Sequence, residues 1–339
     1  MTAITQSEFF ERVRFRGKPV ANLESTVVSG KARFTVLTPR LLRLEWSETG
    51  TFEDRATYAF PTRYAPAPSF RTKRVGEGLL IDTDTLSLRF RETSGQFTAD
   101  SLSIAFDLDG RQHQWRPGAS AVANLRGTRR TLDRCEGDAA LEPGILSRAG
   151  WSLFDDSHSV LFDPRDGWVI PRPEHEVQDW YFFGHGHDYK GALAEYTRFG
   201  GRIPLGPRYA LGAWWSRYWA YSDQDFKDLV QQFETHGLPL DVLVIDMDWH
   251  TPHGWTGYTW NRELFPDPPA FLRWVHEKGL RVTLNLHPAE GVQAFEEIHP
   301  RFAEAIGLDP ESGQDIPFRI TDRTFTKSSF ELLLHPMDD

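Results

Sequence analysis

Cysteine is nearly absent from this sequence. Among 339 residues the only one is Cys135, so the chain can form neither an internal disulfide nor a cysteine-based zinc site. No apolar run is long enough to cross a bilayer, and the start, MTAITQSEFFERVRFRG, lacks the apolar core of a signal peptide. These absences predict a cytoplasmic protein with no membrane partner.

Runs of basic residues are also scarce. None is longer than a pair such as Arg129 and Arg130, and the formal net charge is -10 with a pI near 5.7. Because binding to phosphate groups needs a concentrated positive surface, the sequence argues against a nucleic-acid partner. The overall charge favours a neutral or cationic substrate.

The sequence lacks the motifs of two common enzyme classes. No serine lies in a nucleophile elbow, and the glycine-rich stretch GHGHD at 184–188 is not followed by the GKS or GKT of a phosphate-binding loop. Covalent serine or cysteine chemistry therefore has no support, and no cofactor is expected.

Residues 1–205 have the pattern of short strands separated by turns. Apolar and polar residues alternate in KARFTVLT, LLRLEWS, GLLIDTDTLSLRF and LSIAFDLDG, with glycine, proline, aspartate and serine between them. No amphipathic helix is evident among these segments. We predict an antiparallel β-sandwich.

The pattern changes in residues 206–339. ALGAWW, DVLVIDM and RVTLNLH are each typical of a strand, and two helices are predicted between them. Ser222 and Asp225 form a capping box for the first helix, which Gly237 ends, and Asp267 caps the second, which stops at Gly279. Alternating strands and helices at this spacing predict a parallel sheet with right-handed crossovers.

Polar and aromatic residues follow each predicted strand, as WSRYWAYS, DWHTPHGWTGYTW and HPAEG. Several strands that lead to one rim favour a (β/α)8 barrel over a doubly wound sheet. A complete barrel takes about 250 residues, and only about 130 remain after Leu211. We therefore expect the first half of a barrel, truncated before strand 4, with DRTFTKSSFELLLHPMDD as a helix leading towards that strand.

A parallel sheet that stops after three strands leaves an open edge. This predicts a poorly soluble chain or self-association into a homo-oligomer.

Two carboxylates, Asp246 and Asp248, follow the strand DVLVI. If the strand continues, residues two apart point to the same side, which at a barrel rim is the mouth. Paired carboxylates perform glycoside hydrolysis, but the catalytic pair normally comes from different elements. We expect Asp246 to contact substrate rather than to react with it.

The aromatic residues near these carboxylates suggest a sugar site. Trp215 and Trp249 belong to a larger group that offers flat faces to sugar rings, and ordinary packing is the alternative for each member. Arg217 among them can stack or bind a carboxylate. His250, His253 and His287 leave open a metal site, which the loop spacing of the first two disfavours, so we expect no metal.

Longer stretches of the chain resemble glycoside hydrolase family 31, the retaining α-glucosidases and α-xylosidases. The resemblance covers nearly all of the chain and is carried by ARFTVLTPRLLRLEWSETGTFEDRATYAF, LEPGILSRAGWSLFDDS, DWYFFGHGHDYKGALAEYTRFGGRIPLGPRYALGAWWSRYW, DVLVIDMDWH and RVTLNLHP. It implies a galactose-mutarotase-like β-sandwich followed by an incomplete (β/α)8 TIM barrel. It also implies hydrolysis of O-glycosyl bonds in α-glucosides or related α-glycosides with retention, on an oligosaccharide substrate and without a cofactor.

The resemblance also implies roles for particular residues. Asp246 matches the aspartate that binds sugar hydroxyls in the innermost subsite, flanked by Asp248 and Trp249, with His287 lining the floor and Asp156 closing one side. The nucleophile and the acid/base are expected beyond Asp339, so no catalytic residue is assigned within the chain. A carbohydrate-binding protein without catalysis and a metal-dependent hydrolase on His250, His253 and His287 remain as alternatives.

Overall fold

The computed structural model describes residues 16–93, 95–127, 129, 135–165, 167–250, 255–319 and 325. The chain divides into two units, and the boundary between them lies after Ile203. None of the helices in these described ranges is both long and apolar enough to cross a membrane. The helix predicted over 322–339 lies outside the described residues, apart from Phe325.

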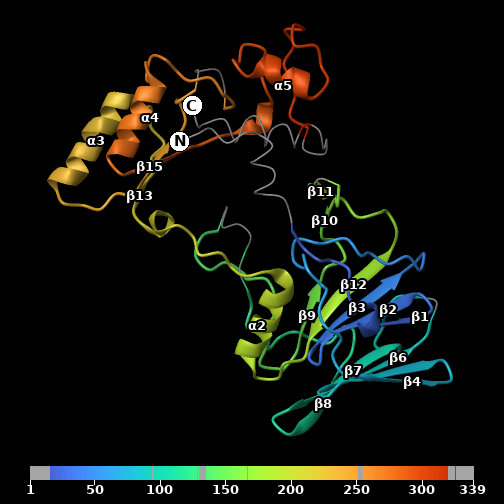
Figure 1. Ribbon diagram of the computed structural model, residues 1–339. Helices are drawn as coiled ribbons and strands as arrows, with labels where there is room; N and C mark the ends of the chain where they lie inside the picture. Colours follow the sequence, from blue (N-terminus) through green and yellow to red (C-terminus); the bar gives the residue numbers. More distant parts are fainter. Residues whose placement is uncertain are drawn as a thin grey trace. The chain divides into compact units, whose positions relative to one another are not determined.

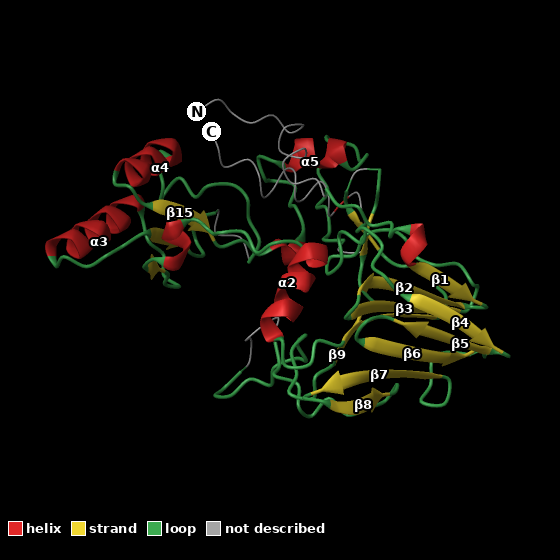
Figure 2. Ribbon diagram, turned by 60° about the horizontal axis from the view of Figure 1, so that its bottom comes forward, coloured by secondary structure: helices red, strands yellow, loops and turns green. Residues whose placement is uncertain are grey.

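The first unit is built from two five-stranded antiparallel sheets (Figures 1 and 2). The first sheet has the order β1 (Thr26–Ser29), β2 (Ala32–Thr38), β3 (Leu41–Ser47), β12 (Val177–Phe183), β9 (Ser152–Asp155). The second sheet runs in sequence order through β4 (Arg71–Val75), β5 (Gly78–Asp82), β6 (Leu86–Arg91), β7 (Leu102–Leu108) and β8 (Arg111–Trp115). A two-stranded ribbon pairs β10 (Leu161–Phe162) with β11 (Val169–Ile170), and a single 3-10 turn, η1 (Leu23–Ser25), precedes β1. The predicted strands are confirmed in β2, β3, β5, β6 and β7.

The core of this unit lies between the two sheets. Alternate residues of both sheets meet there, among them Phe34 and Leu44 from the first sheet and Leu88 and Phe106 from the second. Each of these side chains is almost completely buried. The alternation of apolar and polar residues along these strands therefore reflects the single apolar face of each sheet, which packs against the other sheet.

One helix in this unit was not foreseen. Residues Tyr189–Gly200 form α2, capped by Asp188, whose carboxylate accepts a hydrogen bond from the N–H of Gly191. Only Ala192 and Phe199 of the helix are buried, so its apolar stripe is narrow. This weak amphipathic signal explains why strands alone were expected up to about residue 200.

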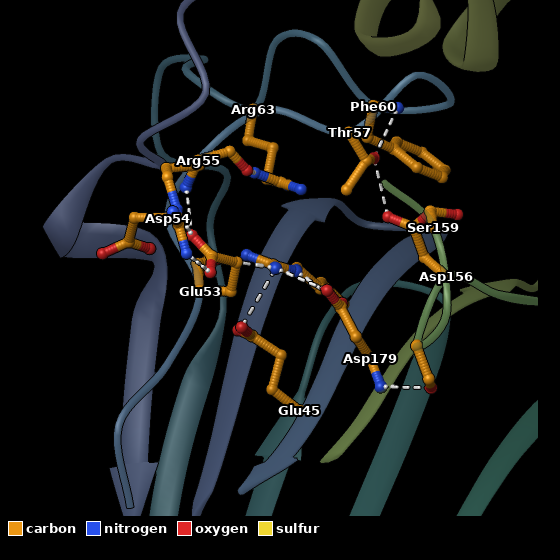
Figure 3. Close-up of polar contacts among 12 residues, drawn as sticks. Glu45, Glu53, Asp54, Arg55, Thr57, Phe60, Arg63, Asp156, Ser159 and Asp179 are labelled. Atoms are coloured by element: carbon orange, nitrogen blue, oxygen red, sulfur yellow. Dashed lines mark hydrogen bonds and ion pairs between the residues drawn. The ribbon is translucent and has the colours of Figure 1, made fainter. Parts of the chain in front are cut away.

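Charged side chains occupy the other face of the first sheet. Nε and Nη2 of Arg43 each donate a hydrogen bond of 2.8 Å to the two carboxylate oxygens of Asp179, and both side chains are at most 3% exposed. Glu45 lies opposite Asp179 on the neighbouring strand and pairs with Arg33, while Arg172 donates to Asp179 at 2.9 Å. Figure 3 shows the contacts around Asp179 and Glu45.

This arrangement sets the ionisation of Asp179. Burial alone would raise the pKa of its carboxyl group, but the guanidinium groups of Arg43, Arg63 and Arg172 outweigh burial and hold the pKa well below its usual range. Asp179 is therefore a permanent anion that compensates several buried cations.

The second unit contains a three-stranded parallel sheet with the order β13 (Trp214–Trp215), β14 (Val242–Ile245), β15 (Arg281–Leu284). Helix α3 (Asp223–Thr235) connects β13 to β14, and α4 (Pro268–Glu277) connects β14 to β15. Shorter helical segments are η2 (Arg208–Leu211), η3 (Pro288–Glu290) and α5 (His299–Ala305). Figure 1 shows α3 and α4 lying side by side.

The predicted caps of this unit are confirmed. Ser222 and Asp225 form the capping box of α3, and the carboxylate of Asp267 accepts a hydrogen bond from the N–H of Ala270 at the start of α4. Phe226 from α3 and Phe271 from α4 pack with their ring centroids 5.9 Å apart. The apolar faces of both helices thereby cover the buried side chains of β14.

Replacement of Asp179 by asparagine tests the buried ion pair. Asp179→Asn should lower the free energy of unfolding by about 3–5 kcal/mol, because it removes the buried carboxylate that Arg43 and Arg172 share and leaves Glu45 alone to compensate Arg43. Urea unfolding followed by circular dichroism measures the loss. Arg40→Gln, which breaks the exposed pair between Arg40 and Asp188, is the control and should cost far less. Equal losses in the two variants would contradict the assigned role of Asp179.

The same pair predicts a pH dependence. Since the folded-state pKa of Asp179 lies below the unfolded value of about 3.9, its stabilising contribution is complete above that pH and is lost as the pH falls further. Between about pH 5 and pH 3 the free energy of unfolding should therefore fall more steeply in the native chain than in Asp179→Asn. Parallel curves for the two proteins would show that Asp179 does not carry this effect.

Candidate functional site

Asp246 directly follows β14, at its carboxyl end. The pairing of β14 with β15 extends one residue further, because the N–H of Asn285 donates to the carbonyl of Ile245 at 2.9 Å. This places the two side chains together, and Nδ2 of Asn285 donates to Oδ1 of Asp246. The N–H of Met247 donates to the same oxygen at 2.9 Å.

The second oxygen of this carboxylate differs from the first. Within the described part of the chain, no residue donates a hydrogen bond to Oδ2 of Asp246, and the side chain is only half-buried. A carboxylate with one oxygen fixed and the other open can accept hydrogen bonds from hydroxyl groups of a bound ligand without first having to be oriented.

Trp249 holds the same strand ends together from inside the unit. Its indole N–H donates to the carbonyl of Asn285 at 2.9 Å, and its ring packs edge-to-face on Trp260 at 5.1 Å. The side chain is 2% exposed. Its surroundings are those of a core residue that supports Asp246 and Asn285, and its contact with substrate stays a prediction.

Asp248 does not continue the strand. β14 ends at Ile245, and Asp248 has a φ of 69°, in the left-handed region that aspartate tolerates better than most residues. The expectation that Asp246 and Asp248 point to the same side by strand alternation is therefore wrong. Asp248 is half-buried, and its carbonyl accepts a hydrogen bond from the side-chain amide of Asn261.

His287 lies two residues after Asn285, beyond the end of β15. Its ring and that of Trp255 are arranged edge-to-face with centroids 5.5 Å apart, and its Nδ1 is buried without a hydrogen-bond partner among the described residues. The ring of Trp255 is 57% exposed. The structure thus brings an open aromatic face to the carboxyl end of the sheet, in the same unit as Asp246.

The segment that carries Trp255 is tied to the segment after β15. The hydroxyl of Thr256 donates to the carbonyl of His287 at 2.5 Å and accepts from the N–H of Glu290 at 3.1 Å. Further along, Oε2 of Glu296 accepts from the N–H of Tyr258 at 3.1 Å and from the hydroxyl of Thr259 at 2.5 Å. Glu296 is 2% exposed. A buried carboxylate therefore fixes this loop.

The residues after β13 lie in different surroundings. The ring of Trp215 packs against Phe233 of α3 at 5.7 Å, so it faces the helix layer, whereas Trp214 is half exposed. Arg217 is exposed, and its guanidinium lies 4.7 Å from the ring centre of Trp219. Because the ring of Trp215 packs against α3, we leave this residue out of the proposed subsite. A contact between Arg217 and substrate stays a prediction.

Asp156 belongs to the first unit and is completely buried. Its Oδ2 accepts a hydrogen bond of 2.7 Å from the hydroxyl of Thr57, and burial together with the nearby charge of Asp179 raises the pKa of its carboxyl group. No surface of this side chain is open to a sugar, so we also leave Asp156 out of the proposed subsite.

Metal binding has little support in the described ranges, where no three histidine, cysteine, aspartate or glutamate side chains are grouped to hold an ion. His250 is buried and its ring packs on Trp249 at 5.4 Å. His253 lies outside the described residues.

Two functional candidates were missed by sequence reasoning. Asn285 was visible as one of the polar residues that alternate with apolar ones in RVTLNLH, but its partner was not. Glu296 gave no signal, because its role depends on contacts with residues 37 and 38 positions away.

The role of Glu296 can be tested through stability. Glu296→Ala should lower the free energy of unfolding by about 1–3 kcal/mol for each buried donor left without an acceptor. Urea unfolding measures the loss, and loss of the contact between Trp255 and His287 should appear as a change in near-ultraviolet circular dichroism. Glu297→Ala, at the exposed neighbouring position, is the matched control and should have little effect on either measurement. If both variants behave like the native chain, Glu296 does not fix the loop.

Residues 203–313 match the family model described as glycosyl hydrolases family 31 TIM-barrel domain. Alpha-xylosidase XylQ of Lactiplantibacillus pentosus is 31% identical over 152 residues, which cover 43% of this chain and 20% of that protein. Alpha-glucosidase 2 of Bacillus thermoamyloliquefaciens is 34% identical over 139 residues, which cover 40% of this chain and 17% of that protein. The matched part is therefore about a fifth of the length of these relatives.

Solved structures show the fold. A glycoside hydrolase family 31 dextranase from Flavobacterium johnsoniae, in complex with glucose, aligns with a TM-score of 0.57 at 15% identity over 83% of this chain and 39% of its own. A xylosidase from Aspergillus niger aligns with a TM-score of 0.57 at 14% identity over 91% and 52% of the two chains. Both support a β-rich unit followed by part of a TIM barrel. Residues 203–313 of this chain are therefore similar to the TIM-barrel domain of glycosyl hydrolases family 31.

Proposed function

We propose that this chain is part of a retaining α-glycosidase that hydrolyses O-glycosyl bonds of α-glucosides or related α-glycosides. The observation that carries the proposal is the carboxylate of Asp246, held through Oδ1 by Asn285 and the N–H of Met247 while Oδ2 stays open. In this function Oδ2 accepts hydrogen bonds from hydroxyl groups of the sugar in the innermost subsite.

The other residues of the subsite have supporting roles. His287 and the exposed face of Trp255 lie against the apolar side of the sugar. Asp248, two residues after Asp246, flanks the same subsite. Trp249, buried in the core of the unit, holds the segment after β14 to the carbonyl of Asn285 after β15. We place the aspartate nucleophile and the acid/base aspartate beyond Asp339, in line with the greater length of the relatives.

The finer description of the fold is part of the same proposal. We assign residues 1–205 to a galactose-mutarotase-like sandwich and residues 206–339 to the first half of the catalytic barrel. A cytoplasmic site of action is proposed on the near absence of cysteine. The substrate is an oligosaccharide, and no cofactor takes part.

Hydrolysis of p-nitrophenyl α-glucoside and α-xyloside tests this function. The 339-residue chain is assayed beside a polypeptide that continues through the following codons of its source DNA. We expect hydrolysis with retention by the longer polypeptide only. Hydrolysis by the 339-residue chain alone would contradict the placement of the nucleophile, and sugar binding without hydrolysis by the longer polypeptide would support a carbohydrate-binding protein instead.

The role of Asp246 is tested in the longer polypeptide. Asp246→Asn should lower kcat/KM by about 10- to 100-fold, the effect of losing hydrogen bonds to a charged group. Asp228→Asn on the exposed face of α3 removes the same charge and should leave kcat/KM unchanged. An equal effect of both substitutions, or none of either, would overturn the assignment of Asp246.

A further inference from the structure

The solvent face of the second sheet carries a hollow of about 370 Å³ with four cationic side chains, which we call the basic hollow. The cations are Lys73, Arg89, Arg91 and Arg116, and Asp100 is the only carboxylate among the described residues of the lining. The lining therefore has an excess of three positive charges, although the whole chain has a formal net charge of -10.

Strand register brings these cations together. Lys73 on β4 lies opposite Leu80 on β5, Leu80 lies opposite Arg89 on β6, and Arg89 lies opposite Ser103 on β7. Residues opposite one another in a sheet point to the same side, so Lys73 and Arg89 share one face. They are two strands apart, a separation of about 10 Å.

Small residues between the cations make the hollow. Gly78 lies opposite Arg91, and Ser101 and Ser103 are buried in the floor beside Leu80. The residues that alternate with these, such as Leu79, Phe90 and Leu102, point to the opposite side and are buried in the core between the sheets. The hollow therefore lies over a packed core.

The cations of the hollow are available to a ligand. Lys73, Arg89 and Arg91 are exposed, and among the described residues none of them forms a side-chain hydrogen bond or an ion pair. Arg116 is held at the rim by hydrogen bonds from its side chain to the carbonyl of Ala99 and to Gln114. In contrast, Arg33 and Arg43 on the first sheet are each bound to carboxylates.

We propose that the basic hollow binds a carboxylated polysaccharide chain. Cations on alternate strands suit an extended polyanion with carboxylates at intervals, and guanidinium groups bind carboxylates through two parallel hydrogen bonds. The floor offers the half-buried Leu80 to the apolar side of a sugar ring. The choice of a glycan rests on the proposed function, since binding here would hold an α-glycosidase on a glycan that carries carboxylated sugars beside its neutral α-linked sugars.

Affinity electrophoresis and titration calorimetry of the 339-residue chain test the proposal, with polygalacturonate as the probe and neutral dextran as its comparison. Binding to polygalacturonate should be tighter than to dextran and should weaken as sodium chloride is added. The double variant Arg89→Gln and Arg91→Gln should bind polygalacturonate at least about 10-fold more weakly, as expected for the loss of two charge-assisted contacts.

A second double variant controls for net charge. Lys31→Gln and Arg111→Gln removes the same two charges from exposed positions of the same unit outside the hollow, and it should bind like the native chain. Equal weakening in the two double variants, or equal binding of polygalacturonate and dextran, would overturn the proposal. Tighter binding of single-stranded DNA of matched charge would also overturn it, because the partner would then be a nucleic acid.

The outcome is independent of the catalytic assignment. In the longer polypeptide, the variant at Arg89 and Arg91 should keep its kcat/KM on the small uncharged p-nitrophenyl glycosides while losing affinity for polygalacturonate. Loss of both together would show that the substitutions disturb the fold and that the hollow is no separate site. Failure of hydrolysis in all proteins would concern the proposed function alone.

Discussion

The parallel strand β14 is covered on both faces, and this constraint determines where the second unit can place polar groups. Val242, Leu243 and Ile245 are at most 2% exposed, so a charge within the strand would have to be buried without water. The first charged position is Asp246, immediately after the strand. The position of the candidate site at the carboxyl end of the sheet follows from the packing of α3 and α4 on β14.

The two sheets of the first unit use charge in opposite ways. On the first sheet, Arg43 and Asp179 are buried together, and each compensates the other in surroundings where neither alone would be stable. On the second sheet, Arg89 and Arg91 are hydrated and lack such partners among the described residues. The first arrangement fixes the structure, whereas the second leaves positive charge free to meet a ligand.

Aromatic residues divide in a similar way around the candidate site. Trp249 and Trp260 pack in the core, and Trp215 is packed against α3, so these rings contribute mainly apolar contact area. Trp255 remains open, and Thr256 holds its loop to the carbonyl of His287. A group of tryptophans that looks uniform in the sequence therefore separates into supporting residues and exposed ones such as Trp255.

The sequence by itself determined the local elements of this protein. The capping box at Ser222 and Asp225, the cap at Asp267, the apolar run of β14 and the alternating pattern of β15 depend on neighbouring residues, so period and spacing were sufficient to predict them. Only the tertiary structure decided which polar groups meet. Asn285 reaches Asp246 across 39 residues, Glu296 reaches Thr259 across 37, and Arg43 reaches Asp179 across 136. Such pairs depend on strand register and loop path, which are fixed by the burial of many side chains together and leave no periodic signal in the chain.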